Sequence, residues 1–322
     1  MVKETQQRLP SQDEEVGESS LPVLKPKKKA LETEKKDFKR TMHLFFDSQD
    51  FNQIQEYGRP RFSMEDILKS LCMMSYHGMS YRRAKSDIGE MKEQGFIKNS
   101  PSKSVLHKYA NKEEVKKLLE QLIQISALFF REHENTIILD STWFSKKMYG
   151  GGFRKVYDKK STTLAKCRKL HISILKNSKI IAYAKTSIGT AHDSPFFEDL
   201  VKTVVKNGFQ INCVLADAGY SAKRNYVICR ELGIYEVYIN FKSNSSTKRS
   251  KGELWRKQLH KHKYDKDSWN KEYRYRPLVE MVFSVLKRKS ANYLRSKKIC
   301  AQDVELLLKA LVYNLTIMGR FN

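Results

Sequence analysis

The sequence has few cysteines and lacks a long apolar run. Its five cysteines are odd in number, widely scattered and never arranged as a CxxC pair, so neither a disulfide framework nor a zinc site is expected. No stretch approaches the roughly 18 to 20 apolar residues that cross a bilayer, and the first residues lack the apolar core of a secretory signal. We therefore expect a cytoplasmic protein with no membrane partner.

Acidic residues are scarce relative to basic ones. The chain has 61 Lys and Arg against 36 Asp and Glu, a formal net charge of +25. This excess favours a polyanionic partner, above all nucleic acid, because Lys and Arg neutralise phosphates and release counterions. A lysine enrichment like that of some thermophiles would normally bring glutamate with it, and here acid does not keep pace. We therefore expect a protein that binds nucleic acid.

Three regions differ in composition. Residues 1–36 mix acidic and basic clusters with few large apolar groups, which predicts a disordered charged tail. Residues 37–132 carry helical patterns, and residues 133–322 alternate β-branched apolar runs with helical patterns, as in an α/β domain. Within the last region, residues at about 242–271 are polar and without periodicity, which we interpret as an insertion or mobile loop.

The helical region has the signals of a helix-turn-helix. Ser63 and Asp66 resemble a capping box that opens one helix, Gly78 can end it, and Ser80 can cap the next. The candidate DNA-contacting residues on the second and third short helices are Arg82, Arg83, Lys103 and Lys108. Short basic helices around a glycine turn fit a reader of the major groove, although any small helical bundle would show the same pattern.

The third region predicts a mixed sheet. Its pattern runs three strands, a helix, a strand, a helix, a strand and a helix, and residues 302–318 are expected to form a last amphipathic helix. Asp140 is expected to end the first strand and Asp217 the fourth. A carboxylate at the tip of a buried strand is costly without a positive partner, and ligands bind at the carboxyl ends of strands in open α/β sheets. Placing the first and fourth strands side by side would bring both acids together.

A single carboxylate, Glu280, interrupts the apolar and basic helix expected from Pro277 onward. Glu280 and Lys287 are seven residues apart and so lie within roughly 20° of the same helix face. Tyr273 and Arg276 precede the proline, which disfavours helical geometry before it, so we place both on the approach to the helix. Taken alone, the helix could equally be a buried one in which Glu280 pairs with Arg276 or Lys287.

Together, Asp140, Asp217 and Glu280 predict a metal site. Three clustered carboxylates repel one another unless a cation neutralises them. Mg²⁺ binds through carboxylates and substrate phosphates, and two such ions about 4 Å apart can activate a nucleophile and stabilise the leaving oxygen of phosphoryl transfer. We therefore expect Mg²⁺ or Mn²⁺ as a pair of ions, with the phosphates coming from DNA.

These motifs resemble those of the DDE transposases of prokaryotic insertion sequences. The resemblance rests on LDST around Asp140, on LADAGYS around Asp217, and on the spacing of Tyr273, Arg276, Glu280 and Lys287, which is the YREK signature of one subgroup. It covers about residues 136–290. It implies an RNase H-like catalytic core, with a mixed five-stranded sheet flanked by helices, preceded by an all-α domain of helix-turn-helix type.

The resemblance also implies an activity. The catalytic, metal-binding triad would be Asp140, Asp217 and Glu280. The contacts to DNA phosphates near the cut end would be Tyr273, Arg276 and Lys287. The reaction would be hydrolysis at the terminal inverted repeats of the element, then attack of the freed 3′-hydroxyls on target DNA, by a homodimer associated with the nucleoid. A nuclease of the same fold without strand transfer, or a transposase-derived DNA-binding protein, is the alternative.

One further segment, HDSP, also resembles a stretch common in these enzymes. It contains His192, Asp193 and Ser194. The sequence assigns these residues no role beyond capping of the following helix by Ser194 or Asp193.

Overall fold

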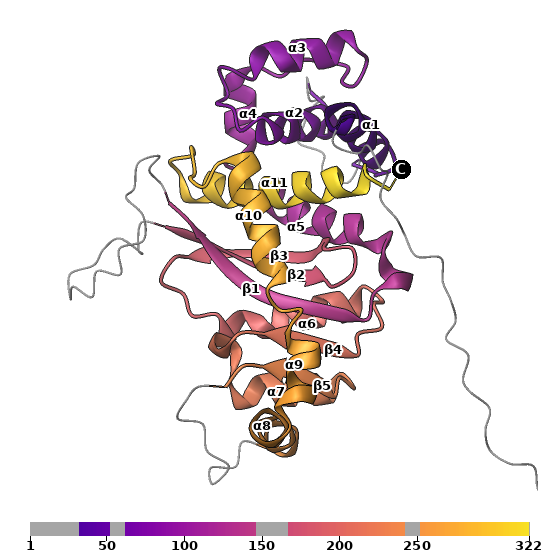
Figure 1. Ribbon diagram of the computed structural model, residues 1–322. Coiled ribbons are helices and arrows are strands. Elements are labelled where there is room, and N and C mark those ends of the chain that lie inside the picture. The colour runs from indigo at the N-terminus through magenta and orange to yellow at the C-terminus, as the bar shows by residue number, and fades with distance from the viewer. Residues whose placement is uncertain (1–31, 52–61, 146–166, 242–251, 322) are drawn as a thin grey trace, which may run out of the picture.

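The computed structural model describes residues 32–51, 62–145, 167–241 and 252–321 (Figure 1). Residues 1–31 of the expected tail lie outside the described residues. The first helix already begins at Glu34, inside the range expected to be tail.

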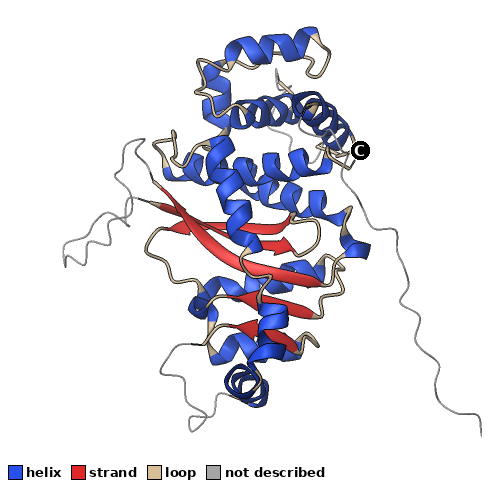
Figure 2. Cartoon of the chain, viewed as in Figure 1, coloured by secondary structure: helices blue, strands red, loops and turns tan. Residues whose placement is uncertain are grey.

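The described part of the N-terminal region is helical, as expected (Figure 2). Its helices are α1 (Glu34–Asp47), α2 (Met64–Tyr76), α3 (Lys85–Glu93), α4 (Lys103–Tyr109) and α5 (Glu113–Leu128). The hydroxyl of Ser63 accepts the backbone N–H of Asp66 and so caps α2. Gly78 follows α2 with a φ of +59°, a conformation that glycine adopts without a steric penalty.

The second helix of the expected helix-turn-helix starts later than predicted. Arg82 and Arg83 lie in a turn, and α3 begins only at Lys85. Lys103 and Lys108 lie on α4 as expected. All four side chains are exposed.

The α/β region contains one mixed five-stranded sheet with the order β3-β2-β1-β4-β5. Its strands are β1 (Thr136–Phe144), β2 (Arg168–Leu175), β3 (Ile181–Ile188), β4 (Cys213–Ala216) and β5 (Glu236–Ile239). β2 runs antiparallel to β1 and β3, whereas β4 runs parallel to β1 and β5. The mixed sheet, with its first and fourth strands adjacent, is therefore confirmed, and its order and directions are those of an RNase H-like fold.

Helices cover both faces of this sheet (Figure 1). After η1 (Arg131–His133), they are η3 (Ser194–Phe196), α6 (Phe197–Lys206), η4 (Ala218–Tyr220), α7 (Lys223–Glu231), α8 (Glu253–Tyr264), α9 (Lys266–Tyr273), α10 (Leu278–Ser290) and α11 (Ile299–Met318). α5 and α11 pack against β3, α6 packs against β2 and β3, and α10 crosses β1.

The expected polar insertion is largely helical. Residues 242–251 lie outside the described residues, but α8 and α9 occupy the rest of the stretch. They pack through a few large side chains: Leu254, Trp255, Leu259 and Trp269 are buried, and the rest of both helices is mostly polar. The interpretation as a loop without periodicity was wrong for this part.

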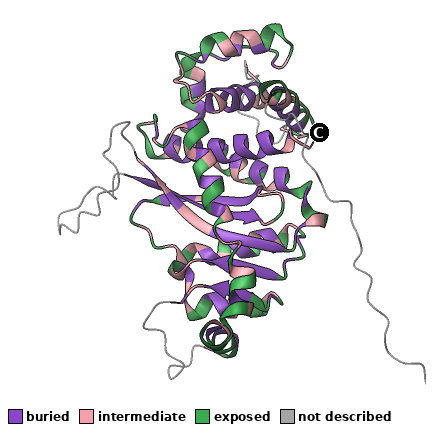
Figure 3. Ribbon diagram, in the orientation of Figure 1, coloured by how far each residue is buried: buried purple, intermediate pink, exposed green. Residues whose placement is uncertain are grey.

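The last helix was expected to be amphipathic, but it is a core element. α11 is buried along almost its whole length, between the sheet and α1 and α2 (Figure 3). Its polar residues have partners inside the protein: Asp303 accepts from Arg168 at 2.8 Å, and Asn314 Oδ1 accepts the N–H of Ile181 at 2.9 Å. One continuous hydrophobic core therefore joins the helical region to the sheet.

α10 is buried on one face and exposed on the other. Val279, Val282, Phe283 and Leu286 face the interior, whereas Met281 is exposed. At its C-terminus, Lys309 of α11 donates to the carbonyl oxygens of Ser290 and Ala291, and Lys289 pairs with Glu34 of α1 at 2.5 Å. The alternative of a buried helix therefore holds only for one face of α10.

Within the described segments, the structure contains no helix both long and apolar enough to cross a membrane.

Candidate active site

Asp140 lies where the parallel part of the sheet ends. The ladder between β1 and β4 stops at the pair Leu139 and Ala216, and β1 then continues to Phe144 paired with β2 alone. The expectation that Asp140 ends its strand was therefore wrong, because the antiparallel partner extends the strand. The carboxylate still emerges at the carboxyl edge of β4, which is the ligand-binding edge of an open α/β sheet.

Asp217 follows β4 directly, as expected. Its carboxylate accepts the backbone N–H of Gly219 at 2.7 Å and thereby caps the short helix η4. Because β1 and β4 are neighbours, both aspartates lie at the same edge of the sheet.

Arg276 joins these two acids to the third. It lies in the turn between α9 and α10, and its Nη2 is 2.7 Å from Asp140 Oδ2 and 4.0 Å from Asp217 Oδ2. Its Nη1 pairs with the carboxylate of Glu280. The structure thus gathers Asp140, Asp217 and Glu280 around one guanidinium, whose side chain is only 16% exposed.

Asp140 is the acid most affected by its surroundings. Burial raises the pKa of Asp140 to about 6, against the opposing effect of the neighbouring Arg276, and the charges of Asp217 and Asp193 add to the increase. A carboxylate in this environment is stabilised by a nearby cation. Its donor oxygens are of the hard kind that Mg²⁺ and Mn²⁺ prefer, and a positive group already lies among them. By chemical type the donor set therefore fits a divalent metal. In this structure, however, the three acids meet through Arg276, and their oxygens do not all lie within 4.8 Å of one another.

The remaining residues of the expected signature lie beside this site. Lys287 is on α10, with its Nζ 5.7 Å from the centre of the Phe144 ring, and burial lowers its pKa while Asp140 acts to raise it. Tyr273 is the last residue of α9 and stacks on Trp269. The basic residues of α4 and of the turn before α3 are not brought to the triad, since α3 and α4 lie across α11 from the sheet (Figure 1).

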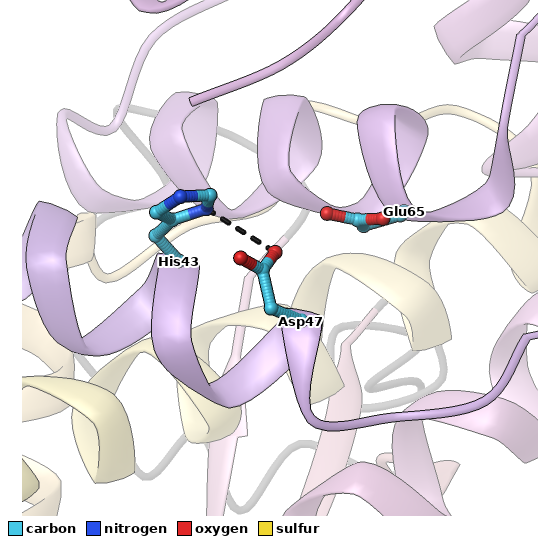
Figure 4. Close-up of side chains that lie close together, drawn as sticks. All are labelled: His43, Asp47 and Glu65. Carbon is cyan, nitrogen blue, oxygen red and sulfur yellow. Dashed lines mark ion pairs between the residues drawn. The ribbon is translucent and has the colours of Figure 1, made fainter. Parts of the chain in front are cut away.

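A second cluster has the composition of a metal site, but the ammonium group of a lysine already lies among its side chains. His43, Asp47 and Glu65 converge between α1 and α2, with ligand atoms within 4.8 Å of one another (Figure 4). The ammonium of Lys69, only 1% exposed, lies 2.7 Å from His43 Nδ1, 2.8 Å from Asp47 Oδ1 and 2.5 Å from Glu65 Oε1. Because this cation satisfies the same atoms that an ion would need, the cluster is a partly exposed ion-pair network around a buried lysine.

Asp193 is the residue that sequence reasoning missed. It precedes η3, but its side chain makes no capping hydrogen bond, so the expectation that it caps the helix was wrong. Instead its Oδ1 accepts from Ser141 Oγ at 2.6 Å and pairs with Lys169 Nζ at 2.7 Å. The available signal was the acid of HDSP together with a lysine on a strand otherwise rich in apolar residues. The hydroxyl of Ser194 accepts from Asn225 at 3.2 Å.

Comparison with known proteins gives one match. The family model described as a transposase DDE domain matches residues 131–315, more than half of the chain, and the matched span includes the three acids around Arg276. No curated protein and no solved structure matches.

Proposed function

Because the chain belongs to the family of transposase DDE domains, we propose that it is the transposase of a prokaryotic insertion sequence of the YREK subgroup. It binds the terminal inverted repeats, cleaves DNA by metal-dependent hydrolysis and joins the 3′-hydroxyl ends to target DNA. The observation that carries this proposal is the convergence of Asp140, Asp217 and Glu280 at the carboxyl edge of β4.

In this proposal, Asp140, Asp217 and Glu280 hold Mg²⁺ or Mn²⁺, as two ions. When bound, such ions activate the attacking oxygen and neutralise the charge that develops on the leaving oxygen. The elements fix the carboxylates differently: Asp140 is carried by a central strand, Asp217 by a capped turn, and Glu280 by the first turn of α10. The side chain of Glu280 is 61% exposed, so packing against the protein does not prevent it from changing its orientation.

The proposed DNA contacts near the cut end are Tyr273, Arg276 and Lys287. Arg276 can bind a phosphate through two parallel N–H donors, and its guanidinium lies beside Asp140. Lys287 adds a positive charge on the face of α10 that carries Glu280. Farther from the cut, the exposed Arg82, Arg83, Lys103 and Lys108 are proposed to contact the terminal repeat. Two ends are cut and joined together, so the working form is proposed to be a homodimer at the nucleoid.

The test is a cleavage and joining reaction with the purified protein, Mg²⁺ or Mn²⁺, and DNA ending in the inverted repeats that flank the gene. We expect Asp140→Asn, Asp217→Asn and Glu280→Gln each to abolish cleavage while binding of end DNA persists. Asp199→Asn, which removes an exposed acid on α6, should cleave as the wild type does.

The alternatives give different results in this test. Cleavage without any joined product would identify a nuclease of the same fold. Binding of end DNA without cleavage under any metal would identify a transposase-derived DNA-binding protein. Near-normal cleavage by one of the three variants would remove that residue from the triad.

A further inference from the structure

Beside the triad, Asp193 is the centre of a polar cluster that the proposed reaction does not use. Its Oδ1 lies 2.6 Å from Ser141 Oγ, 2.7 Å from Lys169 Nζ and 3.4 Å from His171 Nδ1. These three partners come from β1 and β2, the two long central strands. The carboxylate is therefore held from the sheet side by several donors at once.

Lys169 is the fixed member of this cluster. Its side chain is 3% exposed, and its ammonium also donates to the carbonyl of Ala191 at 3.2 Å and lies 4.7 Å from the centre of the Trp143 ring. Trp143 in turn donates to the carbonyl of Gly189 at 2.8 Å. A buried charge with this many partners is locked in one place, and it holds Asp193 there with it.

Asp193 contacts the immediate neighbours of two triad members. Ser141 is the residue after Asp140. On the other side, a Cβ built on Gly219 would lie 3.4 Å from Asp193 Oδ2 and 2.9 Å from Asp217 Oδ1. A side chain at Gly219 would therefore collide with the carboxylate of Asp217, which accepts the Gly219 N–H, and would come into contact with the carboxylate of Asp193, so the turn lies directly against Asp193.

We propose that Asp193 is a positioning residue for the triad: anchored by Lys169, it fixes the segment of Asp140 through Ser141 and packs against the turn of Asp217 at Gly219. This inference rests on the proposed function, since it takes the two aspartates to be metal ligands. Groups that orient metal ligands without touching the metal commonly change metal affinity by 10- to 100-fold when they are replaced.

The test separates this role from simple charge balance. Asp193→Asn alone would leave Lys169 buried without its carboxylate, so the decisive variant is Asp193→Asn with Lys169→Met, which removes both charges. The measurement is Mn²⁺ binding by isothermal titration calorimetry, without DNA, alongside the melting temperature. We expect the double variant to melt close to the wild type and to bind Mn²⁺ at least tenfold more weakly. Wild-type affinity in the double variant would mean that the pair only balances charge, and would overturn the proposal.

A second variant keeps the test decisive if the double variant does not fold. Ser141→Ala removes one hydroxyl and leaves the Asp193–Lys169 pair in place, and we expect it to weaken Mn²⁺ binding by about threefold to tenfold. Unchanged affinity there would equally overturn the proposal. Asp199→Asn is the matched control, with the same change of charge on α6, and should bind Mn²⁺ as the wild type does. A wild type that neither binds Mn²⁺ nor cleaves DNA would refute the proposed function itself, whereas a binding, cleaving wild type with unchanged variants would refute only the role of Asp193.

Discussion

Replacing Arg276 by glutamine removes the positive charge among the three carboxylates while keeping a polar side chain of similar reach. In the wild type, the guanidinium contacts Asp140 at 2.7 Å and also pairs with Glu280. A divalent metal would need the same oxygens. The guanidinium and the metal therefore compete for them, and the variant should be less stable without metal but should bind metal more tightly.

The structure sets the size of both effects. Breaking a fully buried ion pair costs about 3 to 5 kcal/mol. The side chains of Asp140 and Arg276 are 13% and 16% exposed, and that of Glu280 is 61% exposed, so solvent offsets part of this cost. We expect Arg276→Gln to lower the free energy of unfolding in EDTA by about 2 kcal/mol, a fall in melting temperature of roughly 5 °C. Relief of the competition is worth at most the same free energy, or about 10- to 30-fold in Mn²⁺ affinity.

The assay is scanning calorimetry in EDTA and with excess Mn²⁺, together with titration calorimetry of Mn²⁺ without DNA. The matched control is Lys287→Gln, which removes the same charge from the same neighbourhood. Among the described residues Lys287 forms no ion pair with the triad, so its variant should melt within about 1 °C of the wild type and bind Mn²⁺ within about threefold. The reasoning fails if Arg276→Gln melts like the wild type in EDTA, or binds Mn²⁺ no more tightly than the control.

Three further changes test other parts of the structure. Burial acts to raise the pKa of Asp193, but the nearby His171 ring, the Lys169 ammonium and the Ser141 hydroxyl lower it to about 2. This carboxylate therefore stabilises the fold above pH 4 and loses that effect, of about 2 kcal/mol, as the pH falls towards 2. Urea unfolding should show a steeper loss between pH 4 and 2.5 for the wild type than for Asp193→Asn, and parallel curves would contradict it. A variant in which four exposed basic residues of the helical region are replaced by serine should bind end DNA more weakly. The plot of log binding constant against log salt concentration should be shallower by about 1 for each of these residues that contacts phosphate; an unchanged slope would show that they do not contact the DNA. The residues replaced in this variant are Arg82, Arg83, Lys103 and Lys108. Lys69→Ala should free the cluster around Asp47, so that Zn²⁺ raises the melting temperature of the variant but not that of the wild type; equal stabilisation of both would show that the ammonium does not block the cluster.

Local patterns in the sequence were sufficient to predict the sheet. The β-branched runs and turn residues predicted five strands, and the idea that Asp140 and Asp217 meet placed the first strand beside the fourth, as the structure confirms. The end of β1 was misplaced because its continuation depends on β2, a partner that only tertiary pairing brings alongside.

Helices were harder to predict from the sequence where their buried residues do not form one continuous apolar face. α8 and α9 were missed because few of their residues are apolar, and two of the buried ones are tryptophans among charged neighbours. α11 was expected to be amphipathic, but its polar residues Asp303, Lys309 and Asn314 are buried. Their partners are Arg168, the end of α10 and the backbone of β3, none of which a one-dimensional pattern reveals.

The candidate site was predictable as a set of acids but not as an arrangement. Motif spacing picked out Asp140, Asp217 and Glu280. It offered a pairing of Arg276 with Glu280 only as an alternative to a metal site, and it did not reveal that Arg276 also reaches Asp140 and Asp217, which are distant in the sequence. It also gave Asp193 no role, since its partners on β1 and β2 come from distant parts of the sequence.

The attachment of α10 at its far end has a mechanical consequence. Its last carbonyls are held by Lys309 and its Lys289 is paired with Glu34 of α1, while its first turn carries Glu280. The helix has 13 residues and so spans roughly 20 Å. With this end fixed, Glu280 lies roughly 15 Å from the attachment, and a tilt of about 5° there would move it by about 1.3 Å, a displacement large enough to change whether a carboxylate oxygen lies within coordination distance.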